Sequence, residues 1–310
     1  MNASNATPTS PRRKRALVLG GGGSAGNAWL IGVIAGLADS GVHVTTADLI
    51  IGTSAGATAA AQITGAPSAD LFKASLEPVP PRPASAPTHK PNAPVSQTDG
   101  LDRLRRIIAS AENAGDMRRK IGAAALETDA GADGSGSARW RATVAARLPS
   151  HDWPDQLIFI TAVDALTGDG VVLDRTSGVD LADAVAASTS NGIGAGPHRI
   201  GDRRLIDGGY RRNENADLAA GYERVLVLSP LGGRTLHPLE WRMQLSAQVD
   251  ELRAAGSKVE TILPDDASLA AFGDNMMNLA ARPAAARAGF AQGKLLAGGL
   301  GGFWCGTGTI

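Results

Sequence analysis

Short apolar runs alternate with segments of helical spacing along most of the chain. Apolar segments at 29–37 and 55–63 have the spacing of one face of a helix, and each follows a glycine-containing turn. The runs with the length of a buried strand are 16–19, 48–51, 156–162, 171–173 and 224–228. This alternation predicts an α/β fold with a mostly parallel sheet that helices cover on both faces.

A proline-rich stretch interrupts this pattern. Seven of the 17 prolines lie between residues 77 and 100, which favours an extended surface segment over a core element. Helical spacing returns at 101–126 and again at 135–147. We therefore expect residues 77–150 to form an insertion with helical pieces that caps a site carried by the core.

The C-terminal part predicts two closing helices, at 239–255 and 269–296, the second kinked or split by Pro283. The chain then becomes rich in glycine, and we expect residues 298–310 to be a flexible tail. Residues 1–14 are expected to be a disordered basic tail, which leaves 15–297 as one domain.

Composition excludes several classes of protein. The chain has 310 residues, with 30 Lys and Arg against 30 Asp and Glu, so it lacks the basic excess of a nucleic-acid-binding protein. A single cysteine excludes a disulfide framework and a thiolate metal site. The five histidines have no paired spacing, so the sequence offers little to bind a zinc ion. The 39 glycines are the unusual feature, since glycine in this number indicates tight backbone geometry or flexible filler.

The basic residues 12–15 precede an uncharged stretch, 16–38, that has the charge pattern of a targeting or membrane segment. Glycines at 20–23 break the apolar run, and the piece before them is too short for a signal peptide. We expect a cytoplasmic protein without a signal peptide or transmembrane helix, peripheral to a membrane at most.

The glycine-rich turn at 20–26 is the first segment that could carry chemistry. It matches G-x-G-x-x-G at Gly21, Gly23 and Gly26, a pattern typical of dinucleotide-binding turns. A ribose would then need an acid at the end of the second strand, whereas Asp48 lies at its start. What remains is a set of backbone N–H groups at a helix N-terminus, where an anion is stabilised.

The second segment is a G-x-S-x-G between a strand and a helix, with Ser54 at its centre and Gly52 and Gly56 beside it. Such a turn lifts a serine hydroxyl clear of the backbone at a helix N-terminus. A base is needed to activate it, and Asp207 follows the short apolar run at 205–206.

Gly208 and Gly209 follow Asp207 and make a tight turn, so this carboxylate is able to approach another loop closely. Ser54, Asp207 and His237 also stand in the chain order of a hydrolase triad, which leaves a Ser-Asp-His esterase as an alternative. The histidines outside any motif are expected to be exposed polar residues: His43, His89, His151 and His198.

Together the three motifs resemble those of the patatin-like phospholipases: a glycine-rich loop after a strand, then G-x-S-x-G, then D-G-G. The resemblance implies a three-layer α/β/α sandwich and a Ser54–Asp207 dyad that hydrolyses carboxylic esters of lipids without a cofactor. It implies further that the backbone N–H groups of Gly21, Gly22 and Gly23 hold the oxyanion. The expected partner is a lipid or a small acyl ester.

Three positions depart from that family pattern. Ala25 stands where the glycine-rich loop usually has a basic residue, and Asn215 stands where a proline is frequent. The segment 190–197, usually rich in proline, is rich in glycine here. These departures leave a catalytically silent acyl- or lipid-binding scaffold as an alternative, beside the less favoured dinucleotide-binding oxidoreductase.

Overall fold

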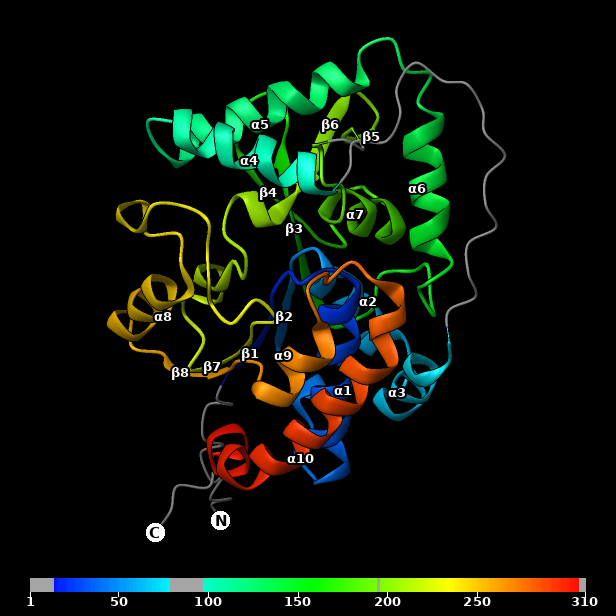
Figure 1. Cartoon of the computed structure of the whole chain (residues 1–310). Helices are drawn as coiled ribbons and strands as arrows, with labels where there is room; N and C mark the ends of the chain where they lie inside the picture. The colour runs from blue at the N-terminus through cyan, green and yellow to red at the C-terminus, as the bar shows by residue number, and fades with distance from the viewer. Residues whose placement is uncertain (1–13, 79–96, 194–195, 307–310) are drawn as a thin grey trace, which may run out of the picture.

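The computed structural model describes residues 14–78, 97–193 and 196–306, and its centre is one eight-stranded sheet (Figure 1). The strands are β1 (Arg15–Leu19), β2 (Leu49–Gly52), β3 (Leu157–Asp164), β4 (Gly170–Leu173), β5 (His198–Ile200), β6 (Arg203–Asp207), β7 (Arg224–Leu228) and β8 (Lys258–Ile262). Their order is β5-β6-β3-β2-β1-β7-β8, and β4 pairs with β3.

Strands β3, β2, β1, β7 and β8 are parallel, whereas β4 and β6 are antiparallel to β3 and β5 is antiparallel to β6. The mostly parallel sheet expected from the sequence is therefore confirmed. Because parallel strands end at one edge of the sheet, the turns after β1 and β2 lie side by side.

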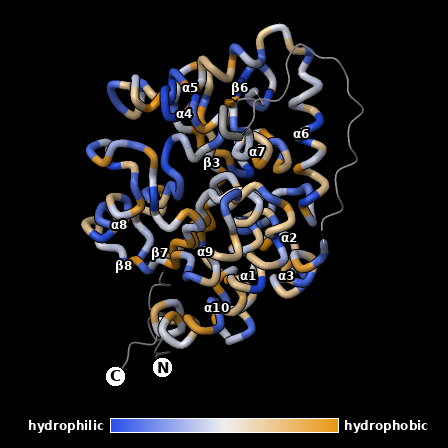
Figure 2. Tube along the Cα trace, in the orientation of Figure 1, coloured by the Kyte–Doolittle hydropathy of each residue, from blue (hydrophilic) through white to orange (hydrophobic). Residues whose placement is uncertain are grey.

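Helices cover both faces of the sheet. They are α1 (Gly23–Asp39), α2 (Ala55–Gly65), α3 (Ser68–Leu76), α4 (Gln97–Ser110), α5 (Ala114–Asp129), α6 (Ser135–Ala145), α7 (Leu181–Ser188), α8 (Leu245–Ala254), α9 (Asp266–Phe272) and α10 (Arg282–Cys305). Figure 2 shows hydrophobic colour along the central strands and more hydrophilic colour towards the periphery.

The side chains of β1 show how the layers form. Leu17 and Leu19 point into the core beneath α1, α2 and α10, whereas Ala16 and Val18 point to the opposite face beneath α8. All four are fully buried, which is why β1 is continuously apolar instead of alternating with polar residues.

The helices of the expected insertion belong to these layers. Met117 and Ile121 of α5 are fully buried against Val163 of β3 and Ile206 of β6, so α5 packs directly on the sheet. The spacing at 101–126 predicted one helix, but the structure has two. The first helix, α4, ends at Ser110, and the second, α5, is capped by Asn113, whose side chain accepts from the N–H of Asp116. Residues 79–96 lie outside the described residues.

The C-terminal prediction needs two corrections. Pro283 neither kinks nor splits a helix: it lies in the first turn of α10, where its missing N–H costs no hydrogen bond. The helix also continues through residues 298–305, which the sequence predicted as the start of a flexible tail. The predicted helix at 239–255 is shorter as well, since α8 begins at Leu245 after a single 3₁₀ turn.

Glycines let α1 and α10 approach each other closely. A Cβ on Gly289 would lie 2.5 Å from the carbonyl oxygen of Trp29, and one on Gly293 would collide with the carbonyl oxygen of Val33. On α1, a Cβ on Gly32 or Gly36 would collide with backbone carbonyl oxygens of α10. Part of the glycine excess is thus explained by helix packing.

Candidate active site

The strand-to-helix turn after β2 holds Ser54 in a strained conformation. Its φ and ψ are 53° and −115°, in a region that residues with a side chain rarely adopt. The glycines beside it permit the turn, because a Cβ on Gly52 would lie 2.6 Å from Ala57 Cα and one on Gly56 would collide with the carbonyl oxygen of Leu19. The turn directs Ser54 to the N-terminus of α2.

A buried hydroxyl on α7 supports this turn. The N–H of Ser54 donates to Ser188 Oγ at 2.9 Å, and Ser188 is completely buried. No local sequence pattern indicated this role of Ser188. The contact shows that α7 helps to hold the Ser54 turn in place.

Asp207 ends β6 and lies next to Ser54. Its Oδ1 accepts from the N–H of Gly209 at 2.8 Å, and its own N–H donates to the carbonyl oxygen of Ser190 at 2.7 Å. Burial raises the pKa of Asp207 to about 6, against the opposing effects of hydrogen bonds from the Ser54 side chain and the Gly209 N–H. A carboxylate with this pKa accepts protons near neutral pH.

The glycine after Asp207 is required by a close approach to β3. A Cβ on Gly208 would collide with Thr161 Oγ1 and would lie 2.5 Å from the carbonyl oxygen of the same residue. The D-G-G turn therefore has a steric reason in addition to its turn propensity.

The glycine-rich loop lies beside Ser54. A Cβ on Gly21 would lie 3.4 Å from Ser54 Cβ and 2.7 Å from Asn213 Oδ1. The N–H of Gly21 donates to the carbonyl oxygen of Asn213 at 3.1 Å. This N–H group was expected to hold the oxyanion, but its hydrogen bond to Asn213 already occupies it. Within the described part of the chain, the N–H groups of Gly22 and Gly23 have no acceptor.

Asn215, a departure from the family pattern, ties the motifs together. Its Nδ2 lies 3.0 Å from Thr53 Oγ1, 3.2 Å from Thr161 Oγ1 and 3.2 Å from the carbonyl oxygen of Gly208. The residue is completely buried, with a φ of 54° that asparagine tolerates and proline cannot adopt. Asparagine at this position thus joins β2, β3 and the D-G-G turn.

A buried carboxyl lies beneath the glycine-rich loop. Glu214 is 1% exposed, and its oxygens lie 2.7 Å from Ser229 Oγ, 2.8 Å from Asn213 Nδ2 and 3.2 Å from Gln248 Nε2. These contacts orient Asn213, whose carbonyl oxygen holds Gly21. Glu214 was not predictable from the sequence, since a lone acid among polar residues gives no local signal of burial.

The glycine-rich loop has a basic neighbour despite Ala25. Arg282 at the start of α10 donates through Nη1 to the carbonyl oxygen of Ser24 at 3.2 Å and to Asn27 Oδ1 at 3.1 Å. Ala25 itself is buried, and its N–H donates to the carbonyl oxygen of Met276 at 2.9 Å. The C-terminal segment therefore braces the loop from outside.

His237 does not complete a triad. Its Nδ1 lies 2.8 Å from Thr235 Oγ1 and its ring stacks on Trp241, with 6.3 Å between ring centroids. Burial, and to a lesser degree the charge of Arg118, lowers the pKa of His237 to about 4. Among the described residues, neither Ser54 nor Asp207 is a partner of this ring.

The remaining histidines follow the sequence expectation with one exception. His43 and His151 are exposed, and His89 lies outside the described residues. His198 is only 2% exposed, because it lies between Asp183 Oδ1 at 2.8 Å and Ser137 Oγ at 2.9 Å. The expectation that it is exposed was wrong, since these two partners come from distant helices.

The cofactor alternatives find little support in this geometry. Asp48 accepts from the N–H of Arg15 at the opposite end of β2 from Ser54, so it is not placed to hold a ribose beside the glycine-rich loop. Within the ranges that the structure describes, no group of three or more His, Cys, Asp or Glu could hold a metal ion.

The family model for patatin-like phospholipases matches residues 17–220, about two thirds of the chain. The chain belongs to the patatin-like phospholipase family. The match covers all three motifs, from the glycine-rich loop to the D-G-G turn. No curated protein sequence matches the chain significantly.

Among solved structures, the chain is similar to one titled as the crystal structure of VipD from Legionella pneumophila. The two are 13% identical with a TM-score of 0.44, over 94% of this chain and 68% of that one. Membership of the patatin-like family associates the chain generally with hydrolysis of lipid acyl groups. None of the described helices is long and apolar enough to cross a bilayer.

Proposed function

We propose that this patatin-like protein is a lipid acyl hydrolase of the phospholipase A or esterase type, with a Ser54–Asp207 dyad. The observation that carries the proposal is the position of Asp207 beside Ser54. The pKa of Asp207 is raised to about 6, and Ser54 itself lies in a turn with a strained backbone. The free N–H groups of Gly22 and Gly23 lie on the neighbouring loop and complete the constellation that acyl transfer needs.

In the first half of the reaction, Ser54 Oγ attacks the ester carbonyl carbon while Asp207 accepts the hydroxyl proton. The N–H groups of Gly22 and Gly23 stabilise the negative charge on the carbonyl oxygen. The C–O bond to the alcohol then breaks, and Asp207 returns the proton to the leaving oxygen. An acyl group remains on Ser54.

The second half repeats these steps with water. Asp207 accepts a proton from the water that attacks the acyl carbon, and then returns the proton to Ser54 Oγ as the acid leaves. A pKa of about 6 makes Asp207 a stronger base than an ordinary aspartate while leaving it mostly ionised at pH 7. Each oxyanion donor supplies roughly 2.7–4 kcal/mol in comparable enzymes.

The decisive experiment uses a fluorophosphonate probe and a series of p-nitrophenyl esters of increasing chain length. We expect the probe to label the wild-type protein at Ser54, and we expect Ser54→Ala and Asp207→Asn each to abolish ester hydrolysis. His237→Ala should retain it. A folded wild-type protein that neither reacts with the probe nor hydrolyses any ester would instead be the catalytically silent lipid-binding scaffold.

The chain-length series also bounds the substrate. An optimum at long acyl chains, together with hydrolysis of phospholipid vesicles, would support a phospholipase that works in peripheral contact with a membrane surface. An optimum at short chains and no action on vesicles would favour a simple esterase.

A further inference from the structure

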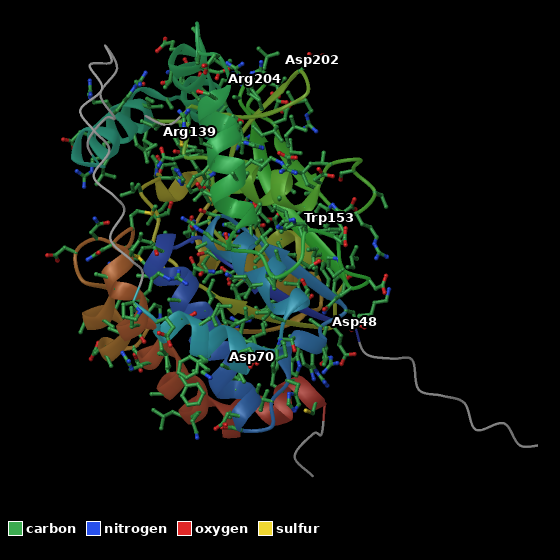
Figure 3. All side chains as sticks on the ribbon, turned by 90° about the vertical axis from the view of Figure 1, so that its right-hand side faces the viewer. Asp48, Asp70, Arg139, Trp153, Asp202 and Arg204 are labelled. Atoms are coloured by element: carbon green, nitrogen blue, oxygen red, sulfur yellow. The ribbon has the colours of Figure 1, made fainter. Side chains whose placement is uncertain are left out.

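A cavity of about 270 Å³ lies on the side of the molecule where α3 and α6 are found, and none of the described residues that line it belongs to the three motifs. Figure 3 faces this side and labels Asp70 on α3 and Arg139 on α6. Apolar walls come from Ile31, Leu71 and Leu148. Arg147, which follows α6, and Arg282, which begins α10, line the same cavity.

Both arginines line this one cavity, and their charges influence each other. Burial lowers the pKa of Arg282, and the positive charge of Arg147 lowers it further. None of the described residues that line the cavity is acidic. An anion bound at this cavity would be attracted by the positive charge of both guanidinium groups.

A chain of hydrogen bonds links the Arg282 guanidinium to the backbone of Arg147, whose own guanidinium lies over a tryptophan ring. Asn27 Oδ1 accepts from Arg282 Nη1, and Asn27 Nδ2 donates to Gln62 Oε1 at 3.0 Å. Gln62 Nε2 then donates to the carbonyl oxygen of Arg147 at 3.1 Å, and the Arg147 guanidinium lies 5.4 Å from the centroid of the Trp140 ring. This chain of contacts reduces the entropy lost on binding a ligand.

Donors remain on Arg282 for such a ligand. Its bonds to Ser24 and Asn27 both use Nη1, so Nε and Nη2 are without a hydrogen-bond partner in the described ranges. Planar guanidinium groups bind phosphate oxygens through paired, charge-assisted hydrogen bonds, and two such groups suit the several acceptors of a phosphate better than the two of a carboxylate.

We propose that this cavity is a binding site for a phosphate group, held between the guanidinium groups of Arg147 and Arg282. If the phosphate is esterified, the carbon of its alcohol would lie beside the apolar wall. Gln62 follows Ser54 by eight residues on α2, which corresponds to roughly 12 Å along the helix. The phosphate site is thus separate from the reacting carbonyl and does not depend on hydrolysis.

The test is calorimetric titration of the full chain with inorganic phosphate in 0.15 M NaCl, where weak surface attraction is screened. We expect saturable binding that Arg147→Gln weakens about tenfold or more, since the variant loses a charge-assisted contact. Arg139→Gln is the matched control: Arg139 is an exposed arginine of the neighbouring helix α6 that donates to Ser135 Oγ outside the cavity.

A second arm distinguishes the source of the phosphate. Ser54→Ala protein, which cannot turn over lipid, is sedimented with phosphatidylglycerol vesicles, and the arginine variants are made in that background. Binding of inorganic phosphate without vesicle binding assigns the site to a free phosphate or a small monoester. Arg147-dependent vesicle binding without binding of inorganic phosphate assigns it to a lipid headgroup.

Three results would overturn the proposal: no binding of either probe, equal weakening by Arg147→Gln and Arg139→Gln, or an affinity for acetate equal to that for phosphate. Should Arg147→Gln lower the melting temperature sharply, Arg147→Lys keeps the charge without the planar fork and should weaken binding less. Because every readout is binding, a negative result here is distinct from an absence of esterase activity.

Discussion

Replacing Asp207 with asparagine should stabilise the fold at neutral pH while abolishing hydrolysis. Burial raises the pKa of Asp207 from 3.8 to about 6, so the folded protein holds this proton more tightly than the unfolded chain does. Between these values stability falls as pH rises, because folding then requires a proton that the unfolded chain has already lost. The loss is complete above pH 6.

The magnitude follows from the two pKa values. Their difference, at about 1.36 kcal/mol per pH unit, gives a destabilisation of roughly 3 kcal/mol at pH 8 and about 1 kcal/mol at pH 4.5. The figure at pH 8 is an upper limit, since Asp207 is only partly screened from solvent. Asparagine is neutral at both pH values, and its carbonyl oxygen is able to accept from Gly209.

The assay is urea-induced unfolding of wild type and Asp207→Asn at pH 4.5 and pH 8. We expect the free energy of unfolding of the variant to exceed that of wild type at pH 8, by up to about 2 kcal/mol more than at pH 4.5. Asp217→Asn is the control, because it removes a carboxylate paired with Arg211 and should not stabilise. A difference between Asp207→Asn and wild type that is the same at both pH values would refute a raised pKa.

Three further predictions rest on other contacts. Ester hydrolysis measured as kcat/KM should fall about tenfold per pH unit below pH 6, as Asp207 gains its proton; a flat profile down to pH 4 would contradict the assigned base. Gly293→Ala should lower the free energy of unfolding by about 1–3 kcal/mol, because the new Cβ collides with the carbonyl oxygen of Val33. Gly298→Ala, in open space on the same helix, should raise it by up to about 1 kcal/mol, and thermal melting measures both. Asn215→Asp should cost about 1–3 kcal/mol in urea unfolding by losing its donors, and wild-type stability would disprove its joining role.

Much of the site was predictable because its parts are local. A strand-length apolar run, a glycine-rich turn and a helical segment are encoded in consecutive residues, and this is how Ser54 and the loop at 20–26 were found. Asp207 was found from its adjacent glycines in the same way. The structure explains these glycines by close backbone approaches at residues 52, 56 and 208.

The supporting residues were not predictable, since their partners are distant in sequence. Ser188 holds the Ser54 turn from 134 residues away, and Asn215 Nδ2 reaches Thr53 Oγ1 across 162 residues. Glu214 is a polar residue that became buried through contacts with Ser229 and Gln248. No local pattern distinguishes such residues from exposed polar ones.

Local signals were enough to predict the α/β class, the order of the motifs and the family, because apolar periodicity and turn glycines act over a few neighbouring residues. Which groups meet depends on how distant segments pack. Tertiary contacts occupy the N–H of Gly21, keep His237 apart from Ser54 and Asp207, bury His198 and extend α10 through residues 298–305. These outcomes depend on packing between segments far apart in the chain, where burial and steric contact override local preference.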